Sequence, residues 1–152
     1  MKKTTTRPLP SRSPRASGPL IWLIEDDVPL IEMYTEALKM GGFEVETTTT
    51  GYESMDKIEK IREGKERKPD LVLLDLLLPD INGIQILQEI RQYKETKDLP
   101  VFILTNYTAP ELREMGFELK VERYLLKTDY TPSQLVELIK ERLKKKRKKP
   151  LN

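Results

Sequence analysis

The sequence contains no cysteine and no histidine among its 152 residues. The lack of cysteine excludes disulfides, thiolate metal sites and cysteine nucleophiles. The lack of histidine excludes imidazole acid–base chemistry, histidine metal ligands and a phosphohistidine on this chain. No apolar run approaches the roughly 20 residues of a membrane-spanning helix. No apolar segment follows the charged N-terminus, so it does not read as a secretory signal. Any chemistry must therefore rest on carboxylates, hydroxyls, lysine and arginine, and we expect a cytoplasmic protein.

Charge is distributed unevenly along the chain, although the formal net charge is only +2. Residues 1–19 carry five basic residues and no acid, and residues 144–152 carry six and no acid, so residues 20–143 have a net charge of −9. We expect a disordered Pro/Ser-rich basic tail (1–19), one domain (20–143) and a basic C-terminal tail (144–152). We interpret the tails as solvated extensions; weak polyanion binding is the alternative.

Five short segments with strand-like patterns alternate with segments of helical spacing. Apolar runs predict strands at residues 20–24, 71–75, 100–105 and 121–126, and the alternating sequence FEVET predicts one at 43–47. A helix is expected after each strand. The first helix ends at Gly41-Gly42, and the second and fifth start at the capping-box sequences TGYE (50–53) and TPSQ (131–134). The third helix carries Ile84, Leu87 and Ile90, and the fourth covers 108–118 with an interruption at Gly116. This alternation predicts a single α/β domain, a doubly wound five-stranded parallel sheet with helices on both faces.

Polar side chains gather where these predicted strands end. In the stretch LVLLDLLLPDING (71–83), one carboxylate, Asp75, follows four apolar residues. Burying an ionised carboxylate without a partner is costly, so other groups should meet it at the strand end. Ligands of open parallel sheets bind at this edge. The other strand-end residues there are Glu25, Asp26, Asp27, Thr105 and Lys127.

This set of residue types suits phosphoryl chemistry. Crowded carboxylates repel one another, and a hard cation such as Mg²⁺, which prefers oxygen ligands, relieves that repulsion. A carboxylate can also attack phosphorus as a nucleophile. A lysine and a hydroxyl nearby would then stabilise the charge of the transferring group.

The motifs at the strand ends resemble those of a known family. They read IEDD (24–27), LLDLLLPDING (73–83), ILT (103–105) and YLLK (124–127). Over residues 20–143 the chain resembles the response-regulator receiver domain of two-component signalling, the CheY-like family. The resemblance implies the flavodoxin-like strand order 2-1-3-4-5.

The resemblance also implies roles for individual residues. Asp75 matches the phosphoacceptor. The Mg²⁺ ligands would be Glu25, Asp26, Asp75 and the backbone carbonyl of Leu77, with Asp26 and Asp75 as the direct carboxylate ligands. Thr105 and Lys127 match the hydroxyl and lysine that contact the phosphoryl group. Thr105 and Tyr124 match the two residues of the conformational switch. Pro79 and Gly83 match the turn after the third strand.

On this basis we expect a single-domain response regulator and phosphoprotein, because too few residues follow the last helix to form an output domain. A partner histidine kinase or phosphotransfer protein would donate the phosphoryl group in a Mg²⁺-dependent reaction. A downstream protein would then bind the face formed by the fourth helix, fifth strand and last helix. Such a protein is not a conventional enzyme and at most assists its own phosphorylation and dephosphorylation.

Two other functions compete with this expectation. One is a receiver-like interaction module that is never phosphorylated. The other is an aspartate-nucleophile phosphatase, which typically has a second acid two residues after the nucleophile, where this chain has Leu77.

The chain departs from the receiver family pattern at three positions around the fourth and fifth strands, namely Asn106, Lys120 and Thr128.

Single residues have simpler interpretations too. Asp75 could cap a turn, the acids at 25–27 could cap a helix, and Tyr124 could be a half-buried core residue.

Two further residues bear on how long a phosphoryl group would persist: Leu77 lies two residues after Asp75, and Tyr107 two residues after Thr105. Both are bulky, and neither carries an acid or amide that could orient the water for hydrolysis, which favours a long-lived phosphorylated state.

Overall fold

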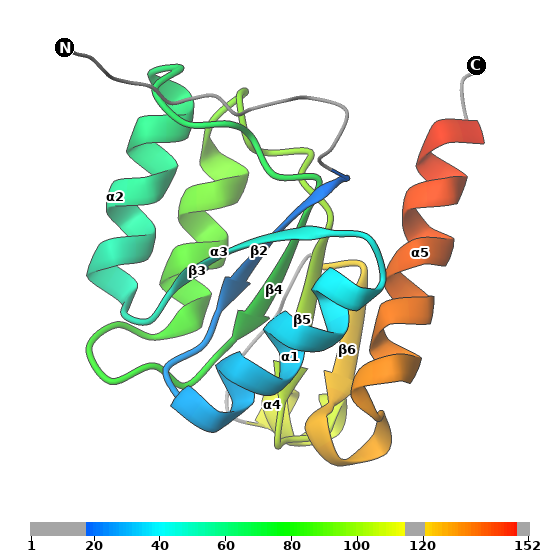
Figure 1. Ribbon diagram of the computed structural model, residues 1–152. Helices are drawn as coiled ribbons and strands as arrows, with labels where there is room; N and C mark the ends of the chain where they lie inside the picture. Colours follow the sequence, from blue (N-terminus) through cyan, green and yellow to red (C-terminus); the bar gives the residue numbers. More distant parts are fainter. Residues whose placement is uncertain (1–17, 115–120, 149–152) are drawn as a thin grey trace, which may run out of the picture.

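The strands form one parallel sheet in the computed structural model, which describes residues 18–114 and 121–148 (Figure 1). The strands are β2 (Leu20–Ile24), β3 (Glu44–Thr48), β4 (Leu71–Asp75), β5 (Val101–Thr105) and β6 (Arg123–Leu126). They lie in the order β3-β2-β4-β5-β6, with every neighbouring pair parallel. The predicted doubly wound sheet and its strand order are therefore confirmed.

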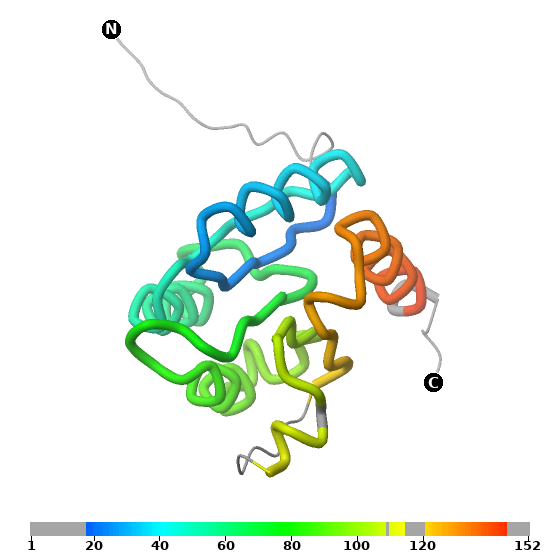
Figure 2. Tube along the Cα trace, turned by 90° about the horizontal axis from the view of Figure 1, so that it is seen from below, coloured from blue at the N-terminus to red at the C-terminus, as the bar shows by residue number. Residues whose placement is uncertain are grey.

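Helices cover both faces of this sheet. They are α1 (Val28–Met40), α2 (Gly51–Arg62), α3 (Gly83–Gln92), α4 (Ala109–Glu114) and α5 (Pro132–Lys148), with a short 3-10 turn, η2 (Lys127–Asp129), after β6. Figure 2 shows α1 and α5 on one side of the sheet and α2 and α3 on the other. Among the described residues, no helix is both long and apolar enough to cross a bilayer.

The core consists of two apolar clusters, one on each face of the sheet. Successive strand residues point to opposite faces, so Ile21 and Leu23 pack toward α1 and α5, whereas Trp22 and Ile24 pack toward α2 and α3. All residues of β2, β4 and β5 are buried. This burial on both faces explains why these strands read as continuous apolar runs rather than alternating ones.

The helix ends show where local sequence signals were accurate. At α5 the capping box forms as predicted: the Thr131 hydroxyl accepts from the amide of Gln134 (3.1 Å), whose side chain accepts from the amide of Thr131 (2.9 Å). At α2 the Thr50 hydroxyl accepts from the amide of Glu53 (3.1 Å), but the Glu53 carboxylate accepts from the amide of Thr49 (2.8 Å) instead of Thr50.

Some boundaries differ from the sequence-based expectations. Helix α5 continues to Lys148, five residues into the segment expected to be a tail, because lysine and arginine are good helix formers. Helix α4 is described to Glu114, whereas Gly116 and Lys120 lie outside the described residues. The expected tail at 1–19 also lies outside them, except for its last two residues.

Candidate functional site

The sheet brings the predicted strand-end residues to one edge. All strand arrows point the same way in Figure 1, and Figure 2 views the molecule from the edge to which they point. In the strand register Asp75 lies beside Leu104, and Thr105 beside Leu126, the residue before Lys127. Residues far apart in the sequence therefore meet because parallel strands end together.

Three carboxylates form the centre of this edge. Glu25, Asp26 and Asp75 each offer an oxygen atom that lies within 4.8 Å of the oxygens of the other two. Glu25 is 1% exposed and Asp75 is 7% exposed, whereas Asp26 is open to solvent. The cluster therefore has a buried floor and an accessible mouth.

Lys127 provides positive charge beside the two buried acids. Its ammonium lies 3.1 Å from Oε1 of Glu25 and 3.5 Å from Oδ2 of Asp75. Burial lowers the pKa of Lys127, but the charges of Asp75 and Glu25 outweigh burial and raise it above its ordinary value. Lys127 therefore remains a cation wherever these acids are ionised.

The site disfavours the ionised form of Asp75. Burial, followed by the neighbouring charge of Glu25, raises the pKa of Asp75 to about 6, against the opposing effects of Lys127 and the Leu77 amide. That amide donates to Oδ1 of Asp75 over 3.3 Å. One lysine thus compensates only part of the negative charge gathered here.

This imbalance predicts a gain in stability when the charge of Asp75 is removed. A carboxyl whose pKa is raised in the folded state loses stability as pH rises through its unfolded and folded pKa values, here about 4 to 6. One pKa unit corresponds to about 1.4 kcal/mol, so with solvent screening at the open edge we expect Asp75→Asn to stabilise the metal-free protein by about 1–2 kcal/mol at pH 7.5.

Chemical denaturation without Mg²⁺ at pH 4 and pH 7.5 checks this prediction. The gain of Asp75→Asn over the wild type should be present at pH 7.5 and small at pH 4, where Asp75 is protonated in the folded state and nearly half protonated in the unfolded state. The surface substitution Asp56→Asn is the control, because Asp56 only pairs with the exposed Lys60. An equal gain at both pH values would contradict the electrostatic cause.

The residues present fit a hard divalent cation. Oε1 of Glu25 is buried, accepts no geometrically aligned hydrogen bond from the described residues, and has the Lys127 ammonium 3.1 Å away as its ion-pair partner. The three carboxylates supply the oxygen ligands that Mg²⁺ prefers. An unsatisfied buried oxygen and excess negative charge are the two features that a bound cation would relieve.

The remaining predicted residues surround this cluster. Thr105 is buried, and its hydroxyl accepts from the amide of Tyr107 (3.1 Å). Tyr124 is 38% exposed on β6, so it is not a core residue in this conformation. Asp27 caps α1, since its carboxylate accepts from the amide of Leu30 (3.2 Å), whereas Glu25 and Asp26 belong to the carboxylate cluster.

The loop after β4 is tightly folded around Gly83. Its amide donates to the Leu76 carbonyl (2.8 Å), and a Cβ atom at Gly83 would lie 2.8 Å from the Asp75 carbonyl oxygen. A side chain there would therefore displace the backbone beside Asp75. Leu77 pairs with Asn82 across the loop, and the Leu77 side chain is 48% exposed.

One residue near the site was not predicted from the sequence as part of it. Tyr34 of α1 is 3% exposed, and burial raises its pKa, with Lys127, Glu25 and Asp75 as its charged neighbours. In the sequence, Tyr34 stands at helical spacing from the apolar residues Leu30, Ala37 and Leu38, a pattern that indicates only a core position. Its polar hydroxyl within an apolar stripe was the available signal.

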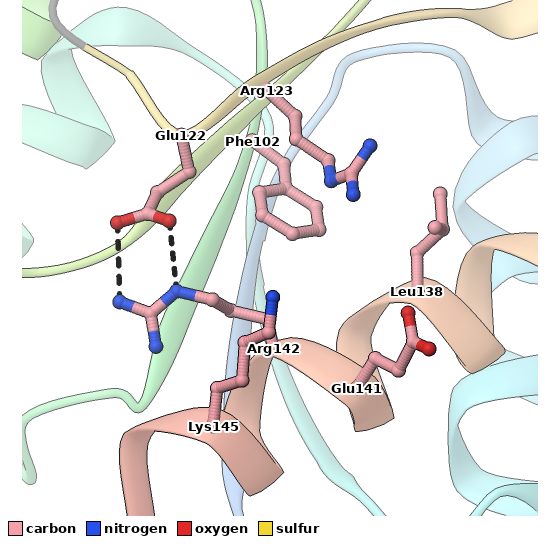
Figure 3. A pocket seen from close by; sticks show the side chains of 7 residues that line it. All are labelled: Phe102, Glu122, Arg123, Leu138, Glu141, Arg142 and Lys145. Carbon is pink, nitrogen blue, oxygen red and sulfur yellow. Dashed lines mark hydrogen bonds and ion pairs between the residues drawn. The ribbon is translucent and has the colours of Figure 1, made fainter. Parts of the chain in front are cut away.

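A cavity of about 580 Å³ lies at the opposite end of the sheet, between β6 and α5 (Figure 3). Arg142 reaches across it and makes two hydrogen bonds to Glu122, of 2.8 and 3.1 Å. Its other lining residues are Phe102, Arg123, Leu138, Glu141 and Lys145. None belongs to the carboxylate cluster, so this cavity is separate from the candidate site.

Sequence comparison links the chain to known regulators. Residues 21–140 match the response regulator receiver domain. The chain is 30% identical over 128 residues to the phosphate regulon transcriptional regulatory protein PhoB of Pseudomonas aeruginosa. The aligned region covers 84% of this chain and 53% of that protein. It is 31% identical over 130 residues to the DNA-binding response regulator MtrA of Mycolicibacterium paratuberculosis, covering 86% and 53%. The chain thus spans about half the length of these curated relatives.

Solved structures show the same likeness. A putative response regulator from Chloroflexus aurantiacus superposes with a TM-score of 0.70 at 31% identity, covering 83% of this chain and 98% of that one. A CheY-like response regulator receiver domain protein from Methanospirillum hungatei gives a TM-score of 0.70 at 25% identity, covering 87% and 98%. The fold is therefore shared along 83–87% of this chain.

Proposed function

Because the chain belongs to the response-regulator receiver family, we propose that it accepts a phosphoryl group on Asp75 from a partner histidine kinase or phosphotransfer protein. The observation that carries this proposal is the position of Asp75. It is a buried strand-end carboxylate beside two further acids, with a lysine ammonium 3.5 Å away. Burial and, after it, the neighbouring charge of Glu25 raise the pKa of Asp75 to about 6 despite the opposing effect of Lys127.

Asp75 acts as the nucleophile in the proposed transfer. One carboxylate oxygen forms a bond to phosphorus while the phosphorus–nitrogen bond of the donor phosphohistidine breaks, and the released imidazole nitrogen takes a proton. The Lys127 ammonium and the Thr105 hydroxyl stabilise charge on the phosphoryl oxygens. The Leu77 amide already donates to Asp75 and holds the carboxylate in orientation.

Glu25, Asp26, Asp75 and the Leu77 carbonyl are the residues that would hold Mg²⁺. When bound, the ion supplies positive charge that offsets the carboxylates and the phosphoryl oxygens. The buried oxygen of Glu25 and the crowding of the three acids support this assignment.

The proposed output is a conformational switch through Thr105 and Tyr124. Their strands β5 and β6 are neighbours, and Thr105 lies two residues beyond Ile103, the register partner of Tyr124. The exposed Tyr124 side chain lies on the strand that adjoins α5, so a change at Thr105 would alter the face made by α4, β6 and α5. The cavity between β6 and α5, toward the end of these elements away from Asp75, offers charged groups of both signs to a downstream partner (Figure 3).

A mass measurement tests the function. The wild type is incubated with phosphoramidate and Mg²⁺, then weighed intact. We expect one added phosphoryl group that is lost on treatment with base, as an acyl phosphate is. An unchanged mass would favour the receiver-like interaction module that is not phosphorylated. Release of inorganic phosphate from small phosphoesters, with catalytic turnover, would favour the phosphatase.

A further inference from the structure

The loop that follows Asp75 is bound to a helix from a different part of the chain. The Asp80 carboxylate accepts from the amides of Gly51 (2.7 Å) and Tyr52 (3.0 Å), the first two residues of α2. It also accepts from the amide of its neighbour Ile81 (2.9 Å). One side chain therefore orders its own loop and the start of α2 together.

These bonds complete the hydrogen bonding at the start of α2. The first amides of a helix have no partner within the helix. At α2 the local cap is Thr50, whose hydroxyl accepts from the amide of Glu53 and whose carbonyl accepts from the amide of Ser54. The amides of Gly51 and Tyr52 depend on Asp80, which is 29 and 28 residues away in sequence.

Close packing reinforces the contact. A Cβ atom at Gly51 would lie 2.4 Å from Cβ of Ile81, so the absence of a side chain lets the loop approach the helix. Hydrogen bonds to Gly51, Tyr52 and Ile81 outweigh the effect of burial and lower the pKa of Asp80. The carboxylate is therefore ionised at neutral pH and available as an acceptor.

The same short loop connects Asp80 to the phosphorylation site. Leu77 lies three residues before Asp80, and its amide donates to Asp75. Beyond Asp80, Asn82 pairs with Leu77 and caps α3 by accepting from the amide of Ile84 (2.8 Å). Hydrogen bonds thus hold the loop at Asp75, at the start of α2 and at the start of α3. Leu77 lies between Asp75 and the residue that binds α2, Asp80.

We propose that Asp80 is a positioning residue for the phosphorylation site: by holding the loop against the start of α2, it keeps the backbone of Leu77 in place beside Asp75. This inference rests on the proposed function of Asp75. Asp80 touches neither the phosphoryl group nor the carboxylate cluster, and it acts through the Leu77 amide and carbonyl.

The test compares Asp80→Ala with Thr50→Ala. Each removes a capping acceptor from the same end of α2, but only Asp80 belongs to the loop that carries Leu77. Mg²⁺ affinity of the unphosphorylated protein is measured by calorimetry, and the phosphorylation rate with phosphoramidate by mass spectrometry. Loss of an outer residue that orients a metal ligand weakens binding tenfold or more, so we expect about a tenfold weaker Mg²⁺ affinity and slower phosphorylation in Asp80→Ala.

Thr50→Ala should lower the unfolding midpoint but leave Mg²⁺ affinity nearly unchanged. Asp80→Asn keeps one acceptor oxygen for Gly51 and Ile81, so it should recover part of the affinity. Amide exchange without metal adds an independent readout: in Asp80→Ala the amides of Gly51, Tyr52 and Leu77 should all exchange faster. In Thr50→Ala the Leu77 amide should keep its wild-type protection.

Equal Mg²⁺ affinities in Asp80→Ala and Thr50→Ala, with equal protection at Leu77, would overturn the proposal and leave Asp80 as a helix cap only. A wild type that binds Mg²⁺ but accepts no phosphoryl group would instead contradict the proposed function. In that case the metal affinities and amide exchange would still decide whether Asp80 positions Leu77.

Discussion

Asp75→Asn is expected to abolish phosphorylation of the intact protein by phosphoramidate and Mg²⁺. The substitution keeps the size of the side chain but replaces the nucleophilic oxygen with an amide that cannot form an acyl phosphate. It also removes a charge that burial and, after it, the charge of Glu25 disfavour, so the variant should be at least as stable as the wild type without metal. Loss of phosphorylation therefore cannot be attributed to unfolding.

Two acids on the same domain serve as controls for this experiment. Asp56 pairs with Lys60 on the surface of α2, and Asp70 accepts from the amide of Leu20 (2.7 Å) at the opposite end of the sheet. Their Asn variants should be phosphorylated like the wild type. Full phosphorylation of Asp75→Asn would place the acceptor elsewhere and remove the basis of the proposed mechanism.

The site residues could be predicted because they follow from a general property of parallel sheets. The three central strands β2, β4 and β5 were recognisable as apolar runs, and the carboxyl ends of parallel strands meet at one edge. Asp75, Thr105 and Lys127 therefore converge even though long segments separate them in the sequence. The motifs then identified which family uses such a set.

Contacts between segments could not be predicted in the same way. Nothing near Asp80 indicates that its partners are the amides of Gly51 and Tyr52, because any helix start could have supplied them. Lys57 is a second case: it is buried between Glu46 and Glu66 and lies over the ring of Trp22. A lysine on a charged helix normally faces solvent, and only the packing of α2 against β3 buries this one.

The fate of the phosphoryl group should depend on Leu77 and Tyr107. Hydrolysis requires water in line with the phosphorus, on the side away from Asp75. Leu77 is joined to Asp75 by its amide, with a half-exposed side chain. Tyr107 is joined to Thr105 by its amide, and its ring is partly buried against the core on the α2 and α3 side. Both flank the site with bulk and offer no carboxylate or amide side chain to orient water.

The double substitution Leu77→Asn and Tyr107→Glu is therefore expected to accelerate loss of the phosphoryl group. Each decrease of about 1.4 kcal/mol in the barrier gives about a tenfold faster reaction, and two polar groups able to orient water should supply at least that. The protein is phosphorylated with phosphoramidate and Mg²⁺, the donor is removed, and the decay is followed by intact mass. The wild type should decay slowly.

A second pair separates polarity from size. Leu77→Met and Tyr107→Phe keep bulky apolar side chains at both positions, so their phosphorylated form should decay at close to the wild-type rate. Decay of the Asn/Glu variant at that same rate would mean that both wild-type side chains point away from the attacking water. Fast decay in both pairs would instead point to loosened packing around Tyr107. Only acceleration confined to the polar pair supports the shielding of Asp75 by these two residues.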